Sequence, residues 1–552
     1  MDHQGRLPST MDHQRSREIV DRSILSGFLS IASGRAISLV MGIATTPVLY
    51  QLLGPRRLGM FSTVVSVQAL FMIFVSAGVT DGVRKYVAED RDRDRWEGAV
   101  VGFYFRLALV LAAVGALVMF AATATGTVAS VFGSTYTPLF YLLVVGVFAA
   151  QFWGYTRRTL MGFGLERYSE PLKVFNQGLF VALALPLVVF GFGAVGALAG
   201  RVFSGLVAAI VGLVIVARRV SLRKAVTSRP DWLPRREMMT FNSLTVLLMF
   251  LMMSLYHVDI IMLQILVGGA EVGYYKSALK LAEFLWMVPL MIQSVFVHSM
   301  SELWSNDRVD RINEIAARTT RYTLLLTALM GLGLVALADV AVPTYFGAEY
   351  APAVTPLVFL VPGAVGFALA RPILAIEQGK GELRYPIAAT GASAVVNLLL
   401  NLALIPRFGM VGAAVATSAG YASMFAFHLW SARQVGFAPL ADLDPETPIH
   451  EVARSVLREQ VVGTHLRVFY DRLSPGNLKR MLSFDQDDRL CLETQKERGE
   501  QPFRARVSLV RFFETNTFLR DCGLLEDDPD AEFEVTPFGA DLLRRAHGGE
   551  TR

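Results

Sequence analysis

The sequence predicts an all-α integral membrane protein with twelve transmembrane helices in two parallel six-helix repeats, followed by a small cytoplasmic α+β domain. Three observations support this prediction. The composition is too apolar for a soluble protein, many apolar segments are long enough to cross a bilayer, and motifs in the first half recur in the second at a nearly constant offset.

The amino-acid composition indicates that most of the chain lies in a membrane. Of its 552 residues, 53% are hydrophobic and 18% are charged, whereas about 25% of the residues of a soluble domain are charged. The mean hydropathy is +0.44. Neither the two cysteines, Cys491 and Cys522, nor the eight histidines have metal-ligand spacing. We therefore expect neither a metal site nor a cofactor.

Twelve apolar stretches are each long enough to cross a bilayer, which takes about 20 mostly apolar residues. They occupy residues 25–52, 59–82, 99–123, 137–156, 172–191, 194–218, 240–266, 272–298, 318–340, 353–377, 385–405 and 411–434. The predicted organisation is a polar N-terminus, an N-lobe, a basic linker and a C-lobe, at residues 1–22, 23–220, 221–238 and 239–436.

The distribution of positive charge predicts the orientation, since Lys and Arg accumulate on cytoplasmic loops. With the N-terminus inside, the five inner loops are rich in Lys and Arg, whereas the six outer loops hold three, Arg56, Arg57 and Arg407. We therefore predict a multi-pass protein of the cell membrane with both termini cytoplasmic. Every outer loop is short and no G-x4-G-K-[ST] loop is present, so we expect no enzyme activity.

Two pairs of motifs show that the membrane part repeats itself. "FGAVGALAG" at 192–200 matches "FGMVGAAVA" at 408–416, and "LGPRRLGMFSTV" at 53–64 aligns with "VGGAEVGYYKSA" at 267–278. The second pair places Gly59 on Gly273. Six helices return the chain to its starting side, so the repeats are parallel, which is typical of transporters with a substrate site between two lobes.

Three stretches resemble the polysaccharide flippase family, the Wzx-type O-antigen exporters of the flippase and multidrug-exporter superfamily. They are "LLGPRRLGMFSTV", "VDIIMLQILVGGAEVGYYKSALKL" and "NLLLNLALIPRFGMVGAAVATSAGY". The resemblance covers about residues 20–436. It implies that lipid-linked oligosaccharides are moved across the membrane, with membrane lipids around the protein. A multidrug or small-cation antiporter of the same superfamily is the alternative.

The substrate that this resemblance implies carries an anionic phosphate or diphosphate, so cations within the spans are candidate ligands. A Lys or Arg at a helix centre costs about 2.5–3.5 kcal/mol. Arg35, among small neighbours in the first span, is the first candidate. Arg371 is a candidate in the second lobe, and Arg157 occupies the comparable place in the first. Arg201, like Arg106, lies nearer a helix end, where it either binds phosphate or snorkels to the surface.

Lys276, Lys280 and Glu283 share one face of the eighth span, which we expect to face inward. The lysines are candidate phosphate ligands. Asp259 lies about as many residues before the outer hairpin as Lys276 lies after it, so the two side chains are expected at a similar depth. Either Asp259 pairs with Lys276 or Lys280, or it is part of a coupling-ion site, and Glu283 has the same two interpretations.

Two polar patches interrupt apolar helices. Asn176 and Gln177 follow Lys173 early in the fifth span, and Asn397 and Asn401 lie on one face of the eleventh. Amides in spans commonly bond neighbouring helices, at about 0.6 kcal/mol each. The alternative is that these four side chains contact the sugars.

The tail, residues 441–552, has 16 Lys/Arg and 22 Asp/Glu, a net charge of −6. Residues 446–552 predict a cytoplasmic domain that resembles a winged helix, which departs from the usual family pattern. Its negative charge argues against binding nucleic acid, although an acidic surface is also typical of a salt-loving host. We expect it to dock polysaccharide-assembly proteins or to regulate the membrane part.

Overall fold

The computed structural model describes residues 11–440 apart from gaps at 77, 90, 92–94, 222–226, 228–229 and 241–242, and for residues 11–36 it describes the backbone alone. Every regular element in this part is a helix. The predicted α+β domain at 446–552 lies outside the described residues.

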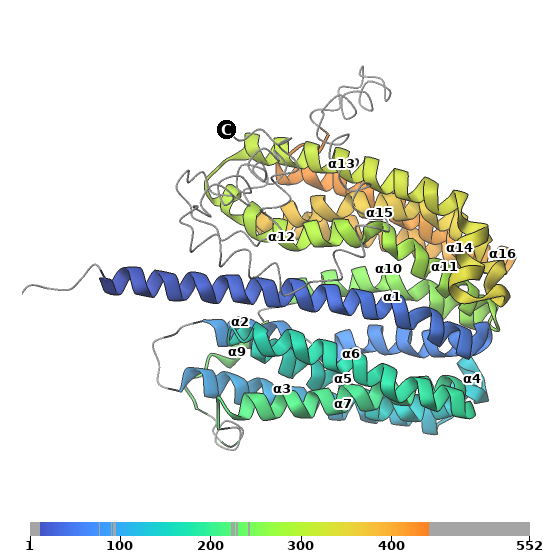
Figure 1. Ribbon diagram of the computed structural model, residues 1–552, viewed down its shortest axis with the longest axis horizontal. Helices are drawn as coiled ribbons and strands as arrows, with labels where there is room; N and C mark the ends of the chain where they lie inside the picture. The colour runs from blue at the N-terminus through green and yellow to red at the C-terminus, as the bar shows by residue number, and fades with distance from the viewer. Residues whose placement is uncertain are drawn as a thin grey trace, which may run out of the picture. The chain divides into compact units, whose positions relative to one another are not determined.

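The helices of the N-lobe are α1 (Met11–Ser76), α2 (Val79–Ala88), α3 (Trp96–Ala124), α4 (Thr127–Phe132), η1 (Ser134–Tyr136), α5 (Thr137–Gly162), α6 (Glu166–Leu187), η2 (Val188–Phe192) and α7 (Gly193–Ala217) (Figure 1). The short helix α9 (Arg235–Thr240) lies in the linker. The C-lobe comprises α10 (Ser243–Leu266), α11 (Glu271–Ala282), η3 (Glu283–Trp286), α12 (Met287–Ser305), α13 (Val309–Ala336), α14 (Ala338–Phe346), η4 (Ala348–Ala353), α15 (Val354–Lys380) and α16 (Arg384–Val435).

The chain forms two compact units. The larger, residues up to Val297 and Arg321–Gly436, holds almost all of both lobes. The described part of the smaller comprises His298–Thr320 and residues 437–440. Within it, the backbone N–H of Ala438 donates to Oδ1 of Asn313 at 2.8 Å.

Eight helical segments in the described residues are long and apolar enough to cross a membrane, which makes the chain a multi-pass membrane protein. Ile37–Ser76, Glu166–Ala217 and Arg384–Val435 contain 40, 52 and 52 residues, whereas about 20 suffice for one crossing. Each contains glycine with non-helical backbone angles, namely Gly54, Gly191 and Gly409. Each long segment is therefore two helices that meet at a glycine.

Contacts on either side of Gly409 show that α16 folds back on itself. The amide of Asn397 lies 3.3 Å from the hydroxyl of Thr417. A Cβ on Gly420 would lie 2.6 Å from the Cβ of Asn397. In the N-lobe, a Cβ on Gly200 would lie 2.7 Å from the backbone of Ala184. In both lobes, small residues let the arms of a hairpin approach closely.

The aligned residues of the two repeats occupy matching places. Gly193 and Gly409 have almost the same backbone angles, with φ 52° and ψ −131° in the first and φ 54° and ψ −133° in the second. The side chain of Arg57 lies against Gly193, and that of Glu271 lies against Gly409. Arg57 and Glu271 align in the repeat, so the two outer hairpins are built to one plan.

Gly59 and Gly273, which the repeat also aligns, face each other where α1 meets α11. A Cβ on Gly59 would lie 3.1 Å from the backbone nitrogen of Gly273. A Cβ on Gly273 would lie 1.9 Å from the carbonyl oxygen of Pro55. The backbones of the two lobes therefore touch here, and only glycine fits at position 273 without movement.

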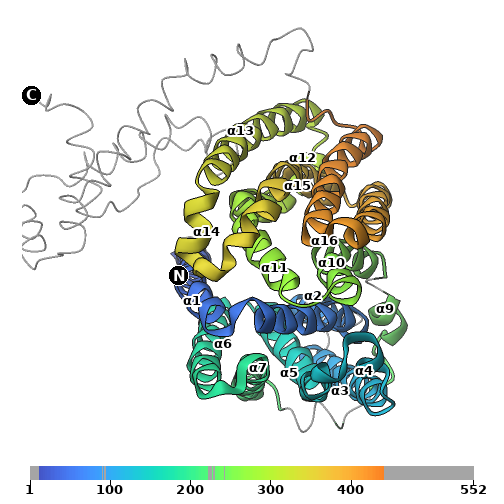
Figure 2. The same cartoon turned by 90° about the vertical axis from the view of Figure 1, so that its right-hand side faces the viewer.

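A second contact joins the lobes at the same end. The Tyr350 hydroxyl donates to the Tyr50 carbonyl at 2.7 Å, and the Tyr345 hydroxyl donates to the Ile43 carbonyl at 2.8 Å. The Tyr50 and Phe346 rings stack at 5.0 Å. Figure 2 shows this end, with α14 beside α1 and α11 close by. The lobes are thus closed against each other at the end that the charge pattern predicts to be outer.

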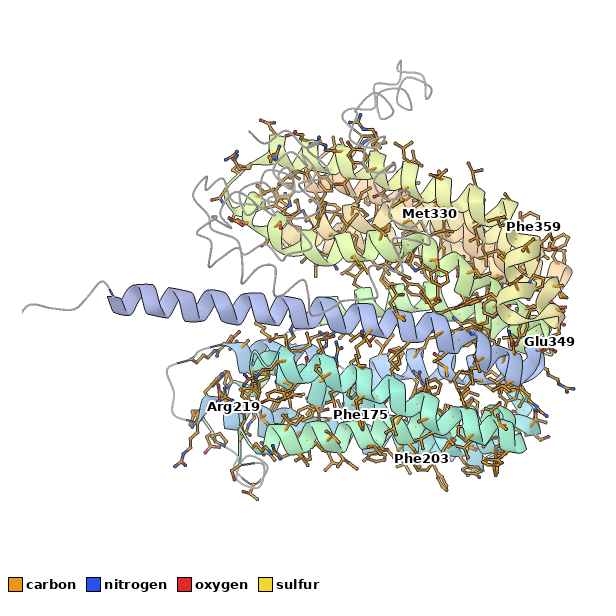
Figure 3. The ribbon with its side chains drawn as sticks, in the orientation of Figure 1. Phe175, Phe203, Arg219, Met330, Glu349 and Phe359 are labelled. Carbon is orange, nitrogen blue, oxygen red and sulfur yellow. The ribbon has the colours of Figure 1, made fainter. Side chains whose placement is uncertain are left out.

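The surface of the membrane part is aromatic and aliphatic between two polar ends. Phe175, Phe203 and Phe359 are 45%, 51% and 45% exposed. Figure 3 shows Phe175 and Phe203 along the length of the bundle, with Arg219 near one end and Glu349 at the other. Arg219 follows the sixth predicted span and Glu349 lies in a predicted outer loop, so the two predicted sides lie at opposite ends of the bundle.

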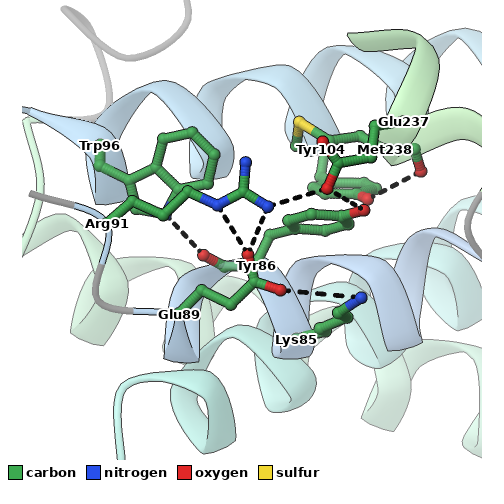
Figure 4. A network of polar contacts seen from close by, with 8 residues as sticks. All are labelled: Lys85, Tyr86, Glu89, Arg91, Trp96, Tyr104, Glu237 and Met238. Carbon is green, nitrogen blue, oxygen red and sulfur yellow. Dashed lines mark hydrogen bonds and ion pairs between the residues drawn. The ribbon is translucent and has the colours of Figure 1, made fainter. Parts of the chain in front are cut away.

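The linker between the lobes is fastened to the N-lobe (Figure 4). The Arg91 guanidinium bonds the Glu237 carboxylate at 2.8 Å and lies over the Trp96 ring. The Tyr104 hydroxyl donates to the Met238 carbonyl at 3.1 Å. Arg91 also holds the pKa of the exposed Glu237 carboxyl below its usual value. Residues 233–240 thus belong structurally to the N-lobe.

We predict that Gly273→Ala destabilises the closed end of the bundle. The added methyl group would overlap the Pro55 carbonyl oxygen, and overpacking of this kind typically costs about 1–3 kcal/mol. The thermal unfolding midpoint of the detergent-purified variant should fall. Gly333→Ala is the control, because nothing lies within 4 Å of a Cβ at that position. Equal midpoints for the two variants would contradict the glycine contact.

Candidate functional site

The charged face of α11 carries one acid between two bases. Glu283, at the start of η3, accepts a hydrogen bond from the Lys280 ammonium at 2.7 Å and from the Lys276 ammonium at 3.5 Å. The three side chains are 20% to 37% exposed. The sequence prediction that they share a face is confirmed, and the cluster carries a net positive charge.

This cluster lies close to the N-lobe. His257, on α10, bonds the Ser66 hydroxyl of α1 through Nδ1 at 3.0 Å. Lys276, Glu283 and Arg201 of α7 all act electrostatically on His257. Cations from both lobes therefore share one neighbourhood, although the Arg201 side chain itself is exposed on α7.

Arg371 lies deeper in the C-lobe, on α15. It is 5% exposed, and its guanidinium donates to the Tyr256 hydroxyl and to the side-chain Oε1 of Gln293, the latter at 3.4 Å. It also lies over the Phe367 ring, 4.0 Å from the centroid. Its Nε has no hydrogen-bond partner among the residues that the structure describes. Within the described residues, Arg371 is thus a buried cation whose recorded partners are neutral.

The corresponding arginine of the N-lobe has a different environment. Arg157 on α5 bonds the Glu170 carboxylate of α6 at 2.8 Å, and Glu170 is buried. The repeat places Arg384 or Tyr385 at the position of Glu170, so the C-lobe lacks this acid. The positive charge is therefore neutralised locally in one lobe and left available in the other.

Asp259, on α10, does not make the lysine pair that was one of its two expected interpretations. It is fully buried, and its carboxylate accepts hydrogen bonds from the Tyr275 hydroxyl, from the Thr417 hydroxyl at 3.1 Å and from the backbone N–H of Ile260 at 2.7 Å. Both lysines pair with Glu283 instead. Asp259 is thus an acid bonded by neutral groups from three helices, α10, α11 and α16.

The two asparagines of the eleventh predicted span extend this acid site. Asn397 is 1% exposed, and its amide lies 3.3 Å from the Thr417 hydroxyl. Asn401 is fully buried and donates to the Asn397 carbonyl at 2.9 Å, while its Oδ1 has no partner in the described residues. Asn397 thus bonds across the two arms of α16, whereas the recorded bond of Asn401 stays within its own arm. Whether either amide contacts sugar stays a prediction.

The remaining candidates lie on α6 and α1. Gln177 donates to the Ser38 carbonyl of α1 at 2.9 Å, so it joins the two helices. The Oδ1 atom of Asn176 is buried without a partner in the described residues. Arg35 lies in α1, one turn before Ser38, but its side chain is outside the described residues. Its role as a phosphate ligand stays a prediction.

Sequence reasoning missed the neutral partners of the buried charges. Tyr256, Tyr275 and Gln293 look like ordinary residues of apolar helices, and nothing in their spacing marks them. Thr417 lies in "VATSAGY", within a stretch that carries the family resemblance, so that stretch was the available signal. The buried pair of Glu377 and His428 was also missed, because the two residues are 51 positions apart.

Comparison with known proteins agrees with this architecture. A family model described as "Polysaccharide biosynthesis protein" matches residues 24–304, and a second model, MatE, matches residues 245–403. The chain is 26% identical over 174 residues to the probable low-salt glycan biosynthesis flippase Agl15 of Haloferax volcanii, covering 31% of this chain and 36% of the relative. It is 25% identical over 249 residues to the probable flippase AglR of the same organism, covering 42% and 48%. The matched region therefore spans less than half of the length of these relatives.

Solved structures share the fold. The lipid II flippase MurJ in an inward closed conformation superposes with a TM-score of 0.59 at 14% identity, covering 80% of this chain and 92% of that one. An inward-facing multidrug resistance MATE transporter of the MOP superfamily gives 0.57 at 17% identity, covering 70% and 94%. Because the first family model spans just over half of the 552 residues, this chain belongs to the polysaccharide biosynthesis protein family.

Proposed function

We propose that this protein is a flippase that moves polyprenyl-phosphate- or diphosphate-linked oligosaccharides from the cytoplasmic to the outer leaflet of the cell membrane. The proposal includes twelve crossings with both termini in the cytoplasm. Two curated relatives are named as probable flippases, one of them for glycan biosynthesis. Their names supply the substrate class, and the charges of this chain supply the independent argument.

The observation that favours an anionic substrate is the environment of Arg371. Burying an arginine without a counter-charge is costly, yet the recorded partners of Arg371 are Tyr256, Gln293 and an aromatic ring. A phosphate that entered the C-lobe would provide the missing negative charge, and the planar guanidinium suits a bidentate contact with phosphate oxygens. The protein thereby keeps a cation whose strongest partner is the substrate.

The cluster on α11 would act earlier on the substrate path. One of its two ammonium charges remains after Glu283 is counted, and Arg201 adds a charge from the N-lobe. A phosphate between the lobes would contact groups from both, which links binding to the relative position of the lobes. Arg35 is the further ligand that we propose in α1.

We assign the coupling of transport to the Asp259 site. A buried carboxylate bonded by neutral groups needs a cation to balance it. Oxygen atoms for such an ion are at hand in Asp259, Thr417 and the amides of Asn397 and Asn401. Rotation of the Asn397 side-chain amide by 180° would turn its oxygen toward Thr417 and the ion. A proton or a sodium ion bound here would join α10, α11 and both arms of α16.

The competing proposal is a multidrug or small-cation antiporter. The MatE model match and the MATE fold neighbours favour it. Such a carrier needs an acidic, cation-attracting site, and Asp259 is a buried acid whose recorded hydrogen-bond partners in the described residues are neutral. The basic surplus of Arg371, Lys276 and Lys280 favours the anionic substrate. The two proposals predict opposite results for the first experiment below.

We predict that Arg371→Met lowers transport of a short-chain polyprenyl diphosphate-linked disaccharide into vesicles about ten- to a hundredfold. Charge-assisted hydrogen bonds of about 1.5–3 kcal/mol would be lost. The thermal midpoint should hold or rise, because methionine fills similar volume without a buried charge. Arg407→Ala, an exposed arginine bonded within its own helix, is the control. Unchanged transport of the anion, or faster export of an organic cation, would favour the antiporter.

The Asp259 site generates a second prediction. Asp259→Asn should be as abundant as the wild type, because both lysines keep Glu283 as partner. Its transport should lose any response to a Na⁺ or H⁺ gradient, measured in vesicles with each gradient imposed separately. Asp339→Asn removes an exposed carboxylate of α14 and should change nothing. A variant that still responds to the same gradient would exclude Asp259 as the coupling group.

Arg35 supplies a third prediction. Outward movement of an anion is favoured by an inside-negative potential, by about 2.3 kcal/mol for each charge and 100 mV. Arg35→Ala should weaken voltage-driven transport of the same disaccharide probe, and Arg35→Lys should retain part of it, because lysine lacks the bidentate fork. Transport that is indifferent to Arg35→Ala would mean that the phosphate is held elsewhere.

A further inference from the structure

We propose that Glu377 and His428 form a proton-binding site inside the C-lobe, distinct from the Asp259 site. Both side chains are fully buried, and His428 Nδ1 lies 2.7 Å from Glu377 Oε2. The other ring nitrogen of His428 lies 3.2 Å from the Thr390 hydroxyl. The chain of contacts therefore joins α15 to both arms of α16. Neither residue touches the groups assigned above to substrate or coupling ion.

The chemistry of the pair suits the uptake of a proton. With one proton the pair is neutral overall, either as an ion pair or as a shared hydrogen bond. The second carboxylate oxygen, Oε1 of Glu377, is buried without a partner in the described residues. A bare buried oxygen is less costly in a carboxylic acid than in a carboxylate. Glu377 is consequently the group that takes up a proton, and His428 is its hydrogen-bond partner.

Other charged groups on the helices packed against the pair are occupied elsewhere. Lys380, one turn further along α15, donates to the Val435 carbonyl and pairs with Glu382. The remaining charged groups of α10, α11, α15 and α16 have these partners: Arg371 with Tyr256 and Gln293, Arg384 over the Tyr385 ring, Arg407 with the Ala403 carbonyl, Asp259 with Tyr275 and Thr417, His257 with Ser66, Lys276 and Lys280 with Glu283, and Glu271 with the Met410 backbone N–H. Arg433 of α16 is exposed. In the described residues, no recorded ion pair other than their own involves Glu377 or His428.

The position of the pair links its protonation to Arg371. Gly363 and Gly366 hold the first half of α15 tightly against the backbone of α16. Glu377 holds the second half through His428. Pro372 lies between the halves, and a proline inside a helix removes a backbone hydrogen bond and permits a bend. A change at Glu377 would thus move the second half of α15 about the residue that follows Arg371.

The N-lobe has no equivalent of this site in its described residues. The offset that relates Gly164 to Gly379 places Gly162 at the position of Glu377. The offset that relates Gly196 to Gly412 places Gly212 at the position of His428. Neither glycine has a side chain that binds a proton. Within the described residues, the ionisable pair is therefore a feature of the C-lobe alone and is not needed for the six-helix fold that the two lobes share.

Infrared spectroscopy of the full-length protein in liposomes tests the site without any substrate. Between about pH 5.5 and pH 9, exposed carboxylates stay ionised, so a carboxylic acid band that appears at the acid end comes from a buried group. Asp259 is the other buried acid to which a proton is assigned, so the measurement is made in an Asp259→Asn background. We expect the band in that background, its loss when Glu377→Gln is added and its displacement to another pH when His428→Gln is added. Glu349→Gln, in the exposed segment η4, should leave it unchanged.

Glu377→Asp keeps the carboxyl group and guards against a folding failure in Glu377→Gln. It should retain a band that titrates. A band that persists when Glu377→Gln is added to folded Asp259→Asn, or no band in Asp259→Asn alone, would overturn the proton site.

The link to Arg371 rests on the proposed function and has its own readout. In the Asp259→Asn background, where no gradient response is expected, an equal shift of pH on both sides of the membrane should alter transport of the disaccharide probe. Adding Glu377→Gln should abolish this effect, and adding Asp339→Asn should not. Equal responses in all three would overturn the link. If no lipid-linked disaccharide moves at all while the Glu377 band titrates, the proposed flippase function fails and the proton site is supported.

Discussion

Hydrocarbon offers no hydrogen bonds to a protein backbone, and this constraint governs where the chain may leave helical geometry. The breaks at Gly54, Gly193 and Gly409 lie at the end of the bundle that the charge pattern predicts to be outer, away from the middle of the spans. At Gly409 the cost is met directly, since the carboxylate of Glu271 accepts a hydrogen bond from the backbone N–H of Met410 at 2.8 Å. The contact between the lobes lies beside the first of these turns, because Gly273 of α11 lies against the carbonyl of Pro55, which follows Gly54.

The sequence predicted the fold more fully than the site. Apolar segments of fixed length and glycines at offsets of 214 to 216 follow from backbone physics, so they are visible without coordinates. The common face of Lys276, Lys280 and Glu283 was also visible, because helical spacing determines which side chains share a face. The partner that the sequence suggested for the lysines was Asp259, whereas the structure pairs them with Glu283. The partners of Asp259 and Arg371 were not visible, since Tyr275, Thr417 and Tyr256 reach them from helices that are remote in sequence. The tail and the Arg35 side chain remain predictions.

The two lobes treat buried charge differently although they share one plan. The N-lobe pairs Arg157 with Glu170, and this arrangement needs no ligand. The C-lobe leaves Arg371 and Asp259 with neutral partners and adds the pair of Glu377 and His428. A buried charge with only neutral partners gains a counter-charge when a ligand of opposite sign binds. A charge that is already in an ion pair gains little. We therefore propose that the C-lobe is the half in which binding of a substrate or an ion changes the structure.

The contact of Gly59 with Gly273 also has an evolutionary consequence. In a dimer of two identical six-helix chains related by a twofold axis, one codon would have supplied both glycines, and any substitution would have appeared on both sides at once. After duplication and fusion, the two positions mutate separately. One half can then replace its glycine while the other half keeps the backbone contact. Among related proteins we therefore expect variation in which half has the glycine, with the contact between the halves itself retained.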